Sequence, residues 1–215
     1  TAGNATGTFN STRATEYVSK FLNGTLPVST GIIDPRRGLL YTLVDNGAGP
    51  TVAGATQGLT SWPEENMSQI GTGLFRDTNA TAAGGDEDSY VITLAESKFL
   101  LAEAIEKGYL TSGNAKSEFD AGITASMTLL GATPGTYLTA INAKPGLGWN
   151  AGTNIESIMT QKWVALNGIN ALESFIEYTR TGYPNVPLAT TAQYPNRPRR
   201  LLYPTSELVS NSANV

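Results

Sequence analysis

Residues 155–183 constrain the fold most, because they predict two short amphipathic helices joined by a tight corner. The first helix is followed by Asn167-Gly168, a pair typical of a helix C-terminus. The second ends at Gly182 and Pro184, since proline cannot continue a helix. Two apolar helix faces require burial, so this pair must dock on further helices. The residues expected on the two buried faces are Ile155, Ile158, Met159, Lys162, Trp163 and Leu166 in the first helix and Leu172, Phe175, Ile176 and Thr179 in the second.

Three further helices are predicted upstream of this pair. The first covers residues 12–23. The second starts at Tyr90 and carries so little polar surface that we expect it to be largely buried. The third covers residues 115–130, with Asn114 as its N-cap and small residues such as Gly122 that allow a neighbouring helix to approach closely. Its expected core stripe is Phe119, Ile123, Met127 and Leu130.

Long loops separate the predicted helices. Residues 24–90 contain repeated glycine and proline turn signals, and only residues 38–44 are typical of a strand. Residues 131–153 form a second loop, and residues 184–215 form a proline-rich tail. A loop region as long as the first tends to be functional when it is ordered. The sequence thus predicts a mainly α fold with long loops and little β structure.

The residue types missing from the chain exclude several kinds of chemistry. Its 215 residues include no cysteine, which removes disulfides, thiol nucleophiles and cysteine–zinc sites. They include no histidine either, which removes Ser-His-Asp triads and the commonest general base near neutral pH. The net charge of −4 argues against nucleic acid as a partner. We expect no catalytic residue, no cofactor and no metal.

Two tryptophans stand in polar loops where no helical or strand period predicts their burial. Trp62 lies in TSWPEENMSQ with Glu64 and Asn66 nearby, and Trp149 lies in GLGWNAG. A tryptophan ring offers a flat face to a pyranose, and amides and carboxylates beside it bind the hydroxyl groups. We name Trp62, Asn66 and Trp149 as candidate glycan-binding residues. The alternative is that each tryptophan only fixes its own loop to the scaffold.

Two residues of the first helix in the pair are expected to be structural. Lys162 lies in an apolar stripe, and an unpaired lysine in the core costs several kcal/mol. We therefore expect it to pair with Glu173 or another acid. Trp163 lies on the same face and is expected to anchor the core.

Two charged segments could bind a charged ligand, an anion in one case and calcium in the other. A structural or solvated role is the preferred interpretation of both. Pro198 and Pro204 stiffen the tail, which favours docking onto the helix pair over recognition of an anionic ligand. The run Asp86-Glu87-Asp88 could ligate calcium, but its spacing fits no EF-hand and solvated acidic loops are common. The tail residues concerned are Arg199, Arg200, Tyr203 and Glu207.

Several stretches resemble, in the same order, segments of the SusD/RagB family of nutrient-capturing surface lipoproteins of Gram-negative bacteria. The run QKWVALNGINALESFIEYTRTGYP, followed by PRRLLYPTSEL at 198–208, resembles the C-terminal signature of that family. Upstream, ESKFLLAEAIEKGYL at 96–110, FDAGITASM at 119–127 and Asp34-Pro35-Arg36 resemble other family segments. The resemblance covers residues 30–215 and is closest to the SusD-like, starch-binding, outer-membrane-associating subgroup.

This resemblance implies a fold of tetratricopeptide-like helical hairpins that carry long loops. Family members are longer and begin with a signal and a lipid-modified cysteine, neither of which is in this sequence. We therefore expect residues 1–215 to be the C-terminal portion of one SusD-like domain whose lipid anchor lies elsewhere. The expected parts are a helix plus long loops over 1–90, two helical hairpins over 91–183 and an extended tail over 184–215.

The function that the resemblance implies is non-catalytic capture of oligosaccharides or polysaccharides at the cell surface. The captured glycan would pass to a SusC-like TonB-dependent transporter in the outer membrane. Peptide cargo, as in relatives of the RagB type, is an alternative with the same partner, and it would need an extended groove with polar groups. A third hypothesis is that the protein is a glycoside hydrolase, an enzyme that requires two carboxylates roughly 5–9.5 Å apart. The loop acids available for it are Glu64, Glu65, Asp86 and Asp88.

Overall fold

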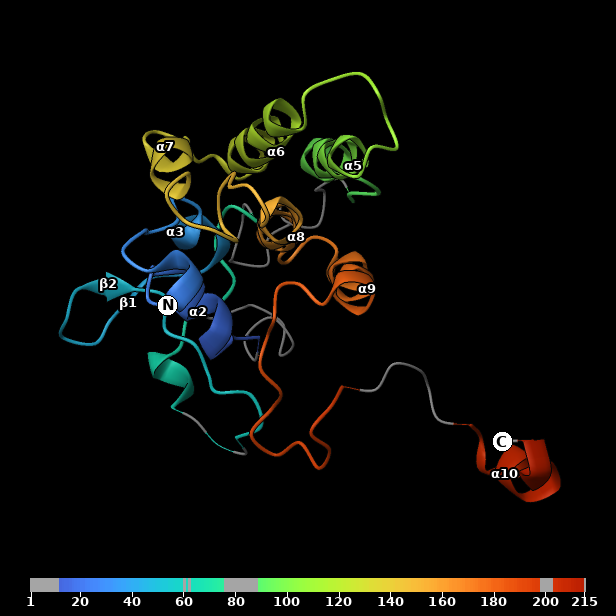
Figure 1. Cartoon of the computed structure of the whole chain (residues 1–215). Coiled ribbons are helices and arrows are strands. Elements are labelled where there is room, and N and C mark those ends of the chain that lie inside the picture. The colour runs from blue at the N-terminus through green and yellow to red at the C-terminus, as the bar shows by residue number, and fades with distance from the viewer. Residues whose placement is uncertain (1–11, 60, 62, 76–88, 198–202, 215) are drawn as a thin grey trace.

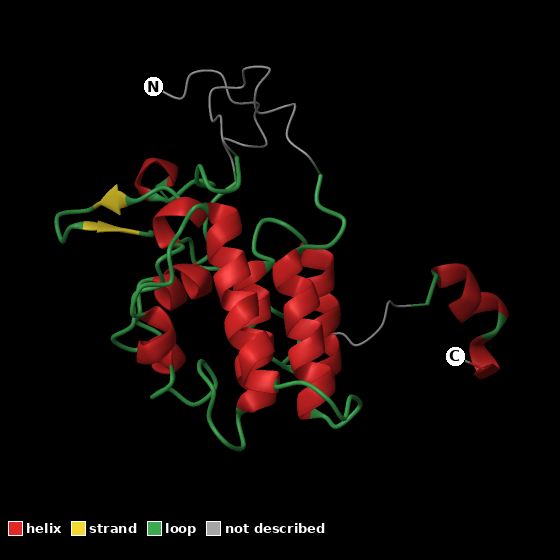
Figure 2. Ribbon diagram, turned by 90° about the horizontal axis from the view of Figure 1, so that it is seen from above, coloured by secondary structure: helices red, strands yellow, loops and turns green. Residues whose placement is uncertain are grey.

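A computed structural model of the chain shows a helical body with long connecting loops, which confirms the mainly α prediction (Figure 1). Figure 2 shows its long helices running alongside one another. These helices are α5 (Leu94–Glu106), α6 (Ala115–Leu130), α8 (Asn154–Ala165) and α9 (Ala171–Thr181). The structure describes residues 12–59, 61, 63–75, 89–197 and 203–214.

Shorter elements surround this body. The predicted helix over residues 12–23 is confirmed as α2, which ends before Asn23-Gly24. A short helix, α7, interrupts the loop expected over residues 131–153. The bounds are α2 (Glu16–Leu22), η1 (Pro27–Ser29), α3 (Arg37–Leu40), β1 (Val44–Asp45), β2 (Pro50–Thr51), η2 (Glu64–Asn66), α7 (Tyr137–Ile141), α10 (Thr205–Ser210) and η3 (Ser212–Asn214).

The central helix is α8, which contacts α5, α6 and α9. The apolar face predicted for it is confirmed, because Ile158, Met159 and Leu166 are almost wholly excluded from solvent. Gln161 and Lys162 are buried as well. Buried polar groups need hydrogen-bond partners, and each of these two side chains belongs to a separate polar network.

Close packing of α5 on α6 depends on a glycine. A Cβ atom placed on Gly122 would lie 2.9 Å from ring atoms of Phe99, so only glycine allows the two helices to approach this closely. Asn114 caps α6 as predicted, since its Oδ1 accepts a hydrogen bond from the Ser117 backbone N–H at 2.9 Å. The core stripe is also confirmed by the burial of Phe119, Ile123, Met127 and Leu130.

The strand predicted over residues 38–44 is wrong. Its first three residues lie in the helical turn α3, Tyr41 forms an isolated bridge with Ile70, and only its last residue enters the two-stranded antiparallel pair β1–β2. The Asp34 carboxylate accepts a hydrogen bond from the Arg36 backbone N–H at 2.9 Å and so favours a turn, after which Leu40 is fully buried. A short apolar run does not by itself distinguish a buried helix from a strand.

A buried ion pair holds α3 against α6, α7 and α8. Arg36 donates to both carboxylate oxygens of Asp34, from Nε at 2.9 Å and from Nη2 at 2.7 Å. The same guanidinium donates to Ser126 and to Gln161, and the Tyr137 hydroxyl donates to Asp34 at 3.0 Å. Burial and the nearby carboxylate raise the pKa of Tyr137, so its phenol stays a neutral donor. The Asp34-Pro35-Arg36 motif is thus a structural element that ties four segments together.

The face of α9 that contacts the helical body is opposite to the predicted one. Leu172, Phe175 and Ile176 are 67%, 53% and 45% exposed, whereas Glu177 is buried. The prediction was wrong because an apolar stripe is not the only means of fixing a helix. Here the charged side of α9 faces α5 and α8 and forms ion pairs with them.

The buried side of α5 combines acidic and apolar residues. The helix begins at Leu94 with Thr93 as its N-cap, and not at Tyr90 as predicted. Leu94 is 66% exposed, whereas Glu96 and Glu103 are buried. The helix was expected to be largely buried, and the structure confirms this for one side only, since Leu100 and Leu101 are also exposed.

The tail has two described parts. Residues 184–197 have no regular structure and run beside α9. The later part, α10, has no buried residue and lies apart from the helical body (Figure 1). The predicted docking of Glu207 onto the helix pair is therefore wrong, while Arg199 and Arg200 lie outside the described residues. Within the described part of the chain, no helix is both long enough and apolar enough to cross a bilayer.

Candidate functional site

The first predicted glycan site is only partly described. Trp62 lies outside the described residues, as do Asp86 and Asp88. Asn66 ends the 3-10 helix η2 and is exposed, and its backbone N–H donates to the Pro63 carbonyl at 3.0 Å. The amide of Asn66 is therefore open to a ligand, and glycan binding at this loop stays a prediction.

Trp149 packs one side of its ring on the core. Its centroid lies 5.4 Å from that of Phe119 in α6, and its loop is held by a hydrogen bond from Asn150 to the Gly148 carbonyl. η2, coloured teal in Figure 1, lies on the far side of α2 and α8 from α6. The structure therefore does not bring Asn66 and Trp149 into one site. Glycan binding by Trp149 stays a prediction for the part of its ring that remains exposed.

A cleft beside α9 gathers aromatic and polar side chains that the sequence did not identify. It consists of two adjoining cavities, of about 370 and 720 Å³, that share Phe175, Tyr178 and Arg197. Ala171 and Ser174 add to its α9 wall, and their spacing of i, i+3, i+4 and i+7 with Phe175 and Tyr178 marks one helix face. We call this region the α9 cleft.

The α8–α9 corner supplies the floor of the cleft. Trp163 lines the cleft and also makes edge contacts with Tyr17 and Phe21, at centroid distances of 5.5 and 5.4 Å. Its predicted role as a core anchor is confirmed, because this side of the ring packs on α2. Asn167 is oriented by the Tyr41 hydroxyl, which donates to its Oδ1 at 2.7 Å. This hydrogen bond leaves the Asn167 amide N–H groups available to a ligand.

Residues 184–197 form the opposite wall. The Arg197 guanidinium lies 5.0 Å from the centroid of the Tyr178 ring, and its Nη2 donates to the carbonyls of Val186 and Pro187 at 2.8 Å each. Further along this segment, the Thr190 backbone N–H donates to the Gln57 carbonyl at 2.9 Å. The segment is therefore fixed at both ends, against α9 and against the loop before η2.

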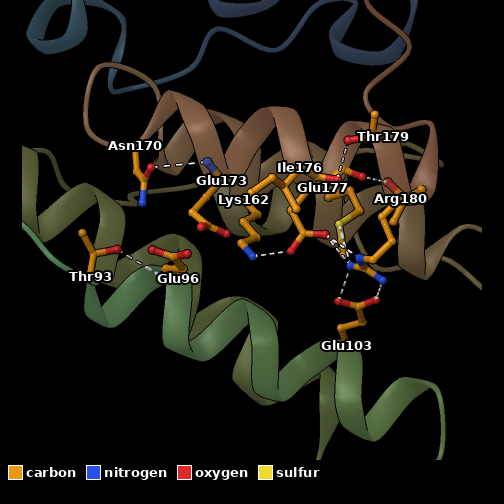
Figure 3. Close-up of polar contacts among 12 residues, drawn as sticks. Thr93, Glu96, Glu103, Lys162, Asn170, Glu173, Ile176, Glu177, Thr179 and Arg180 are labelled. Atoms are coloured by element: carbon orange, nitrogen blue, oxygen red, sulfur yellow. Dashed lines mark hydrogen bonds and ion pairs between the residues drawn. The ribbon is translucent and has the colours of Figure 1, made fainter. Parts of the chain in front are cut away.

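An ion network behind α9 holds the helix in place (Figure 3). Lys162 Nζ of α8 lies 2.6 Å from Glu177 Oε1 of α9, and both side chains are almost fully buried. Arg180 of α9 binds Glu103 of α5 through two parallel hydrogen bonds of 2.6 and 2.8 Å, and it also pairs with Glu177. The predicted acid partner of Lys162 is thus confirmed, and it is Glu177 instead of Glu173. The network places the aromatic face of α9 toward the cleft.

The two buried acids of α5 differ in the electrostatics of their surroundings. Burial raises the pKa of Glu103, but hydrogen bonds from Arg180 and Lys107 outweigh it and hold the pKa below its ordinary value. Burial raises the pKa of Glu96, and the nearby charge of Lys162 only partly opposes this. Glu103 therefore stabilises the fold as an anion, whereas ionisation of Glu96 is unfavourable.

A second cavity, on the outer side of α5 and α6, has a different chemical character. This groove of about 600 Å³ is lined mainly by aliphatic side chains, among them Ile92, Leu94 and Leu129. A glycan needs polar groups for its hydroxyls as well as an aromatic face. The described lining of the groove includes Lys98 and three threonines but has Tyr90 as its one aromatic residue. The α9 cleft offers Trp163, Phe175 and Tyr178 beside its polar groups and is the better candidate. Within the described ranges, no group of three or more acidic side chains is arranged to hold a metal ion.

Sequence reasoning missed the α9 cleft because it assigned Phe175 to the core. One signal was available: Glu173, Glu177 and Arg180 recur on the other face of the same helix, and Lys162 stands on the preceding helix. Opposite charges on two facing helices indicate a polar contact between them. Reading that contact first would have left the aromatic face free. Arg197 carried no comparable signal.

The class of the protein follows from its fold, which is an α-helical scaffold of paired helices carrying long loops. The chain belongs to the SusD-like family described as starch-binding and associating with the outer membrane, whose model matches residues 1–204. That assignment confirms the resemblance found in the sequence. No curated protein is similar enough to the chain to count as a match.

Solved structures of the same kind support the assignment. The chain is 27% identical to a SusD homolog from Bacteroides thetaiotaomicron, with a TM-score of 0.61 over 84% of this chain and 42% of that one. It is also 27% identical to a chitin-binding protein, with a TM-score of 0.58 and the same coverage. A SusD homolog from Bacteroides fragilis, 24% identical with a TM-score of 0.53, shares the fold over 76% of this chain and 39% of its own. The chain thus spans less than half the length of these structures.

Proposed function

We propose that the protein binds glycans without transforming them and that the α9 cleft is one of its binding surfaces. The observation that carries this proposal is the exposed ring of Phe175 and the half-buried ring of Tyr178 beside the polar side chains of Asn167 and Arg197. A pyranose stacks its C–H face on such rings while its hydroxyls bind amide and guanidinium groups. The chitin-binding neighbour and the starch-binding family description support a glycan ligand.

The cellular role that we propose follows from the family. The glycan would be captured at the outer surface of the outer membrane and delivered to a SusC-like TonB-dependent transporter. A lipid anchor in a longer protein would hold this chain at the membrane. Trp62, Asn66 and Trp149 are proposed as a second set of glycan contacts, separate from the α9 cleft.

Retardation of the full-length protein in native gels cast with a panel of soluble polysaccharides tests this proposal. The variant Tyr178→Ala removes the central ring of the cleft, and Trp62→Ala and Trp149→Ala test the predicted loops. Leu172→Ala is the matched control, because it lies on α9, is exposed and does not line the cleft. Thermal melts of every variant would check that the fold is retained.

We expect one or more glycans to retard the protein, and Tyr178→Ala to weaken that retardation while Leu172→Ala leaves it unchanged. If only Trp62→Ala or Trp149→Ala abolishes the retardation, the glycan-binding function stands and the binding site lies in the loops instead of the α9 cleft. No retardation by any glycan, with folded protein, would contradict the proposal and direct the search to peptide cargo.

A further inference from the structure

We infer that the glycan bound in the α9 cleft is acidic and carries carboxylate or sulfate groups. This inference rests on the proposed function and specifies its substrate class. Its starting point is the charge of the cleft. The whole chain has 18 acidic and 14 basic residues, yet the described residues that line the cleft include Arg180 and Arg197 and no carboxylate.

The acidic residues of α9 do not line the cleft, and Glu177 is held away from it by the ion network. Figure 3 shows Glu173 and Glu177 on the side of the helix that faces α5 and α8. Arg180 is also held on that side, because its Nη1 and Nη2 donate to the Glu103 carboxylate and its Nε donates to Glu177. The positive charge of Arg180 is thus neutralised within the network. Arg197 is the remaining cation of the cleft.

Arg197 has no acidic partner in the part of the chain that the structure describes. Its Nη2 donates to two backbone carbonyls, and its plane lies over the Tyr178 ring, so neither contact neutralises its charge. A guanidinium is always protonated in proteins and has five N–H donors. The Nε and Nη1 groups therefore remain for a ligand, on a side chain that its stacking contact already fixes in place.

A guanidinium that is fixed in this way binds a carboxylate or sulfate through charge-assisted hydrogen bonds, which are stronger than bonds to a sugar hydroxyl. The Phe175 and Tyr178 rings lie at the same cleft and suit the sugar ring of a uronic acid or sulfated residue. The absence of a carboxylate from the described lining removes the repulsion that an anionic ligand would otherwise meet. Together these features favour an acidic glycan over a neutral one.

The test compares two polymers with the same backbone: polygalacturonate and its methyl ester, which has lost the charge. Binding of the full-length protein to each is measured by affinity electrophoresis and calorimetry, and chondroitin sulfate is added to distinguish sulfate from carboxylate recognition. Three variants probe the charge of the cleft: Arg197→Gln removes the positive charge, Arg197→Lys keeps that charge but loses the planar guanidinium, and Asn196→Asp brings in a negative charge. The last adds a carboxylate at an exposed lining residue while keeping its shape.

We expect at least one of the two acidic polymers to bind ~10-fold more tightly than the ester, and Arg197→Gln to remove that preference. Arg197→Lys should retain part of it, Asn196→Asp should weaken acidic binding severalfold, and added salt should reduce it. Lys116→Gln is the control, since it makes the same change in net charge on α6, at an exposed ion pair away from the cleft. Lys116→Gln should leave the binding of the acidic polymers and of the methyl ester unchanged.

The outcomes separate this inference from the proposed function. Equal binding of polygalacturonate, chondroitin sulfate and the ester, all weakened by Tyr178→Ala, would overturn the acidic preference and leave the glycan function intact. Acidic binding that neither Arg197→Gln nor Asn196→Asp alters would also overturn it. Failure of every acidic and neutral polymer to bind would instead reject the glycan function itself.

Discussion

At the scale of single residues, the strongest constraint is the buried Asp34–Arg36 pair. Arg36 is fully buried, and Asp34 is the acid that neutralises it. Removing one partner of such a pair leaves an uncompensated charge in the core. The residues around the pair come from α6, α7 and α8, so its loss disturbs the junction of four segments.

Asp34→Ala should therefore lower the free energy of unfolding by about 3–5 kcal/mol, as urea denaturation would measure. Asp120→Ala is the matched control. It removes a partly exposed carboxylate that forms an i, i+4 pair with Lys116, so its effect should stay below about 1 kcal/mol. Similar effects of the two substitutions would show that Arg36 finds another partner or water when Asp34 is lost.

The ion network behind α9 makes stability depend on pH. The folded-state pKa of Glu103 is lowered, so its contribution is complete above its unfolded pKa, about 4.3, and is lost as pH falls through the folded value. Glu103→Gln should cost about 1–3 kcal/mol at pH 7 and less at pH 3. Urea unfolding of wild type and variant at the two pH values measures this difference.

Glu96→Gln is the comparison for that experiment. The raised pKa of Glu96 means that its ionised form opposes folding, and its favourable contribution is lost as pH rises. The variant should be as stable as wild type or more stable at pH 7, and equal to it in acid. If Glu96→Gln and Glu103→Gln destabilise the protein equally at pH 7, the opposite pKa shifts of the two acids do not determine their contributions to stability.

At the scale of elements, the close packing of α5 on α6 depends on the contact between Gly122 and the Phe99 ring. Gly122→Ala should lower the free energy of unfolding by about 1–3 kcal/mol, because the added methyl group meets the buried Phe99 ring. The helix propensity of alanine offsets part of this loss. Ser117→Ala, at an exposed position of the same helix, serves as control and should change stability by no more than a few tenths of a kcal/mol. Equal stability of Gly122→Ala and wild type would mean that Phe99 can move aside.

The elements could be predicted from the sequence to different degrees. α6 was predicted with its bounds, N-cap and core stripe, because its apolar period, Asn114 and Gly122 all agree. α9 was predicted as a helix, but its buried face was not. Its docking depends on Glu103 and Lys162 in other helices, and a pairing across helices cannot be read from the period of one of them.

The candidate site was less predictable than the fold for the same reason. The α9 cleft joins Gln57, the α8–α9 corner and Arg197, which are far apart in the sequence. Only the folded chain brings them together. Trp62, Asn66 and Trp149 were chosen because they stand in polar loops, a local criterion that gives no information about which surfaces meet.

At the scale of the whole molecule, stability should be uneven. α9 has one buried residue, Glu177, whereas α6 has seven. Native-state hydrogen exchange should therefore show that α9 amides open at a lower free energy than those of α6. Salt should widen that difference, because it screens the partly exposed Arg180 more than it affects a hydrocarbon contact. Protection of α9 equal to that of α6 would contradict this view of how the helix is held.

The inverted polarity of α9 bears on how a family of this kind diversifies. Lys162 of α8 and Glu103 of α5 hold α9 from one side, whereas Phe175 and Ser174 line the cleft on another. Substitutions at Phe175 or Ser174 therefore change what the cleft offers to a ligand without emptying the core. The ligand preference proposed for this surface can therefore change without loss of the ion pairs that hold the scaffold.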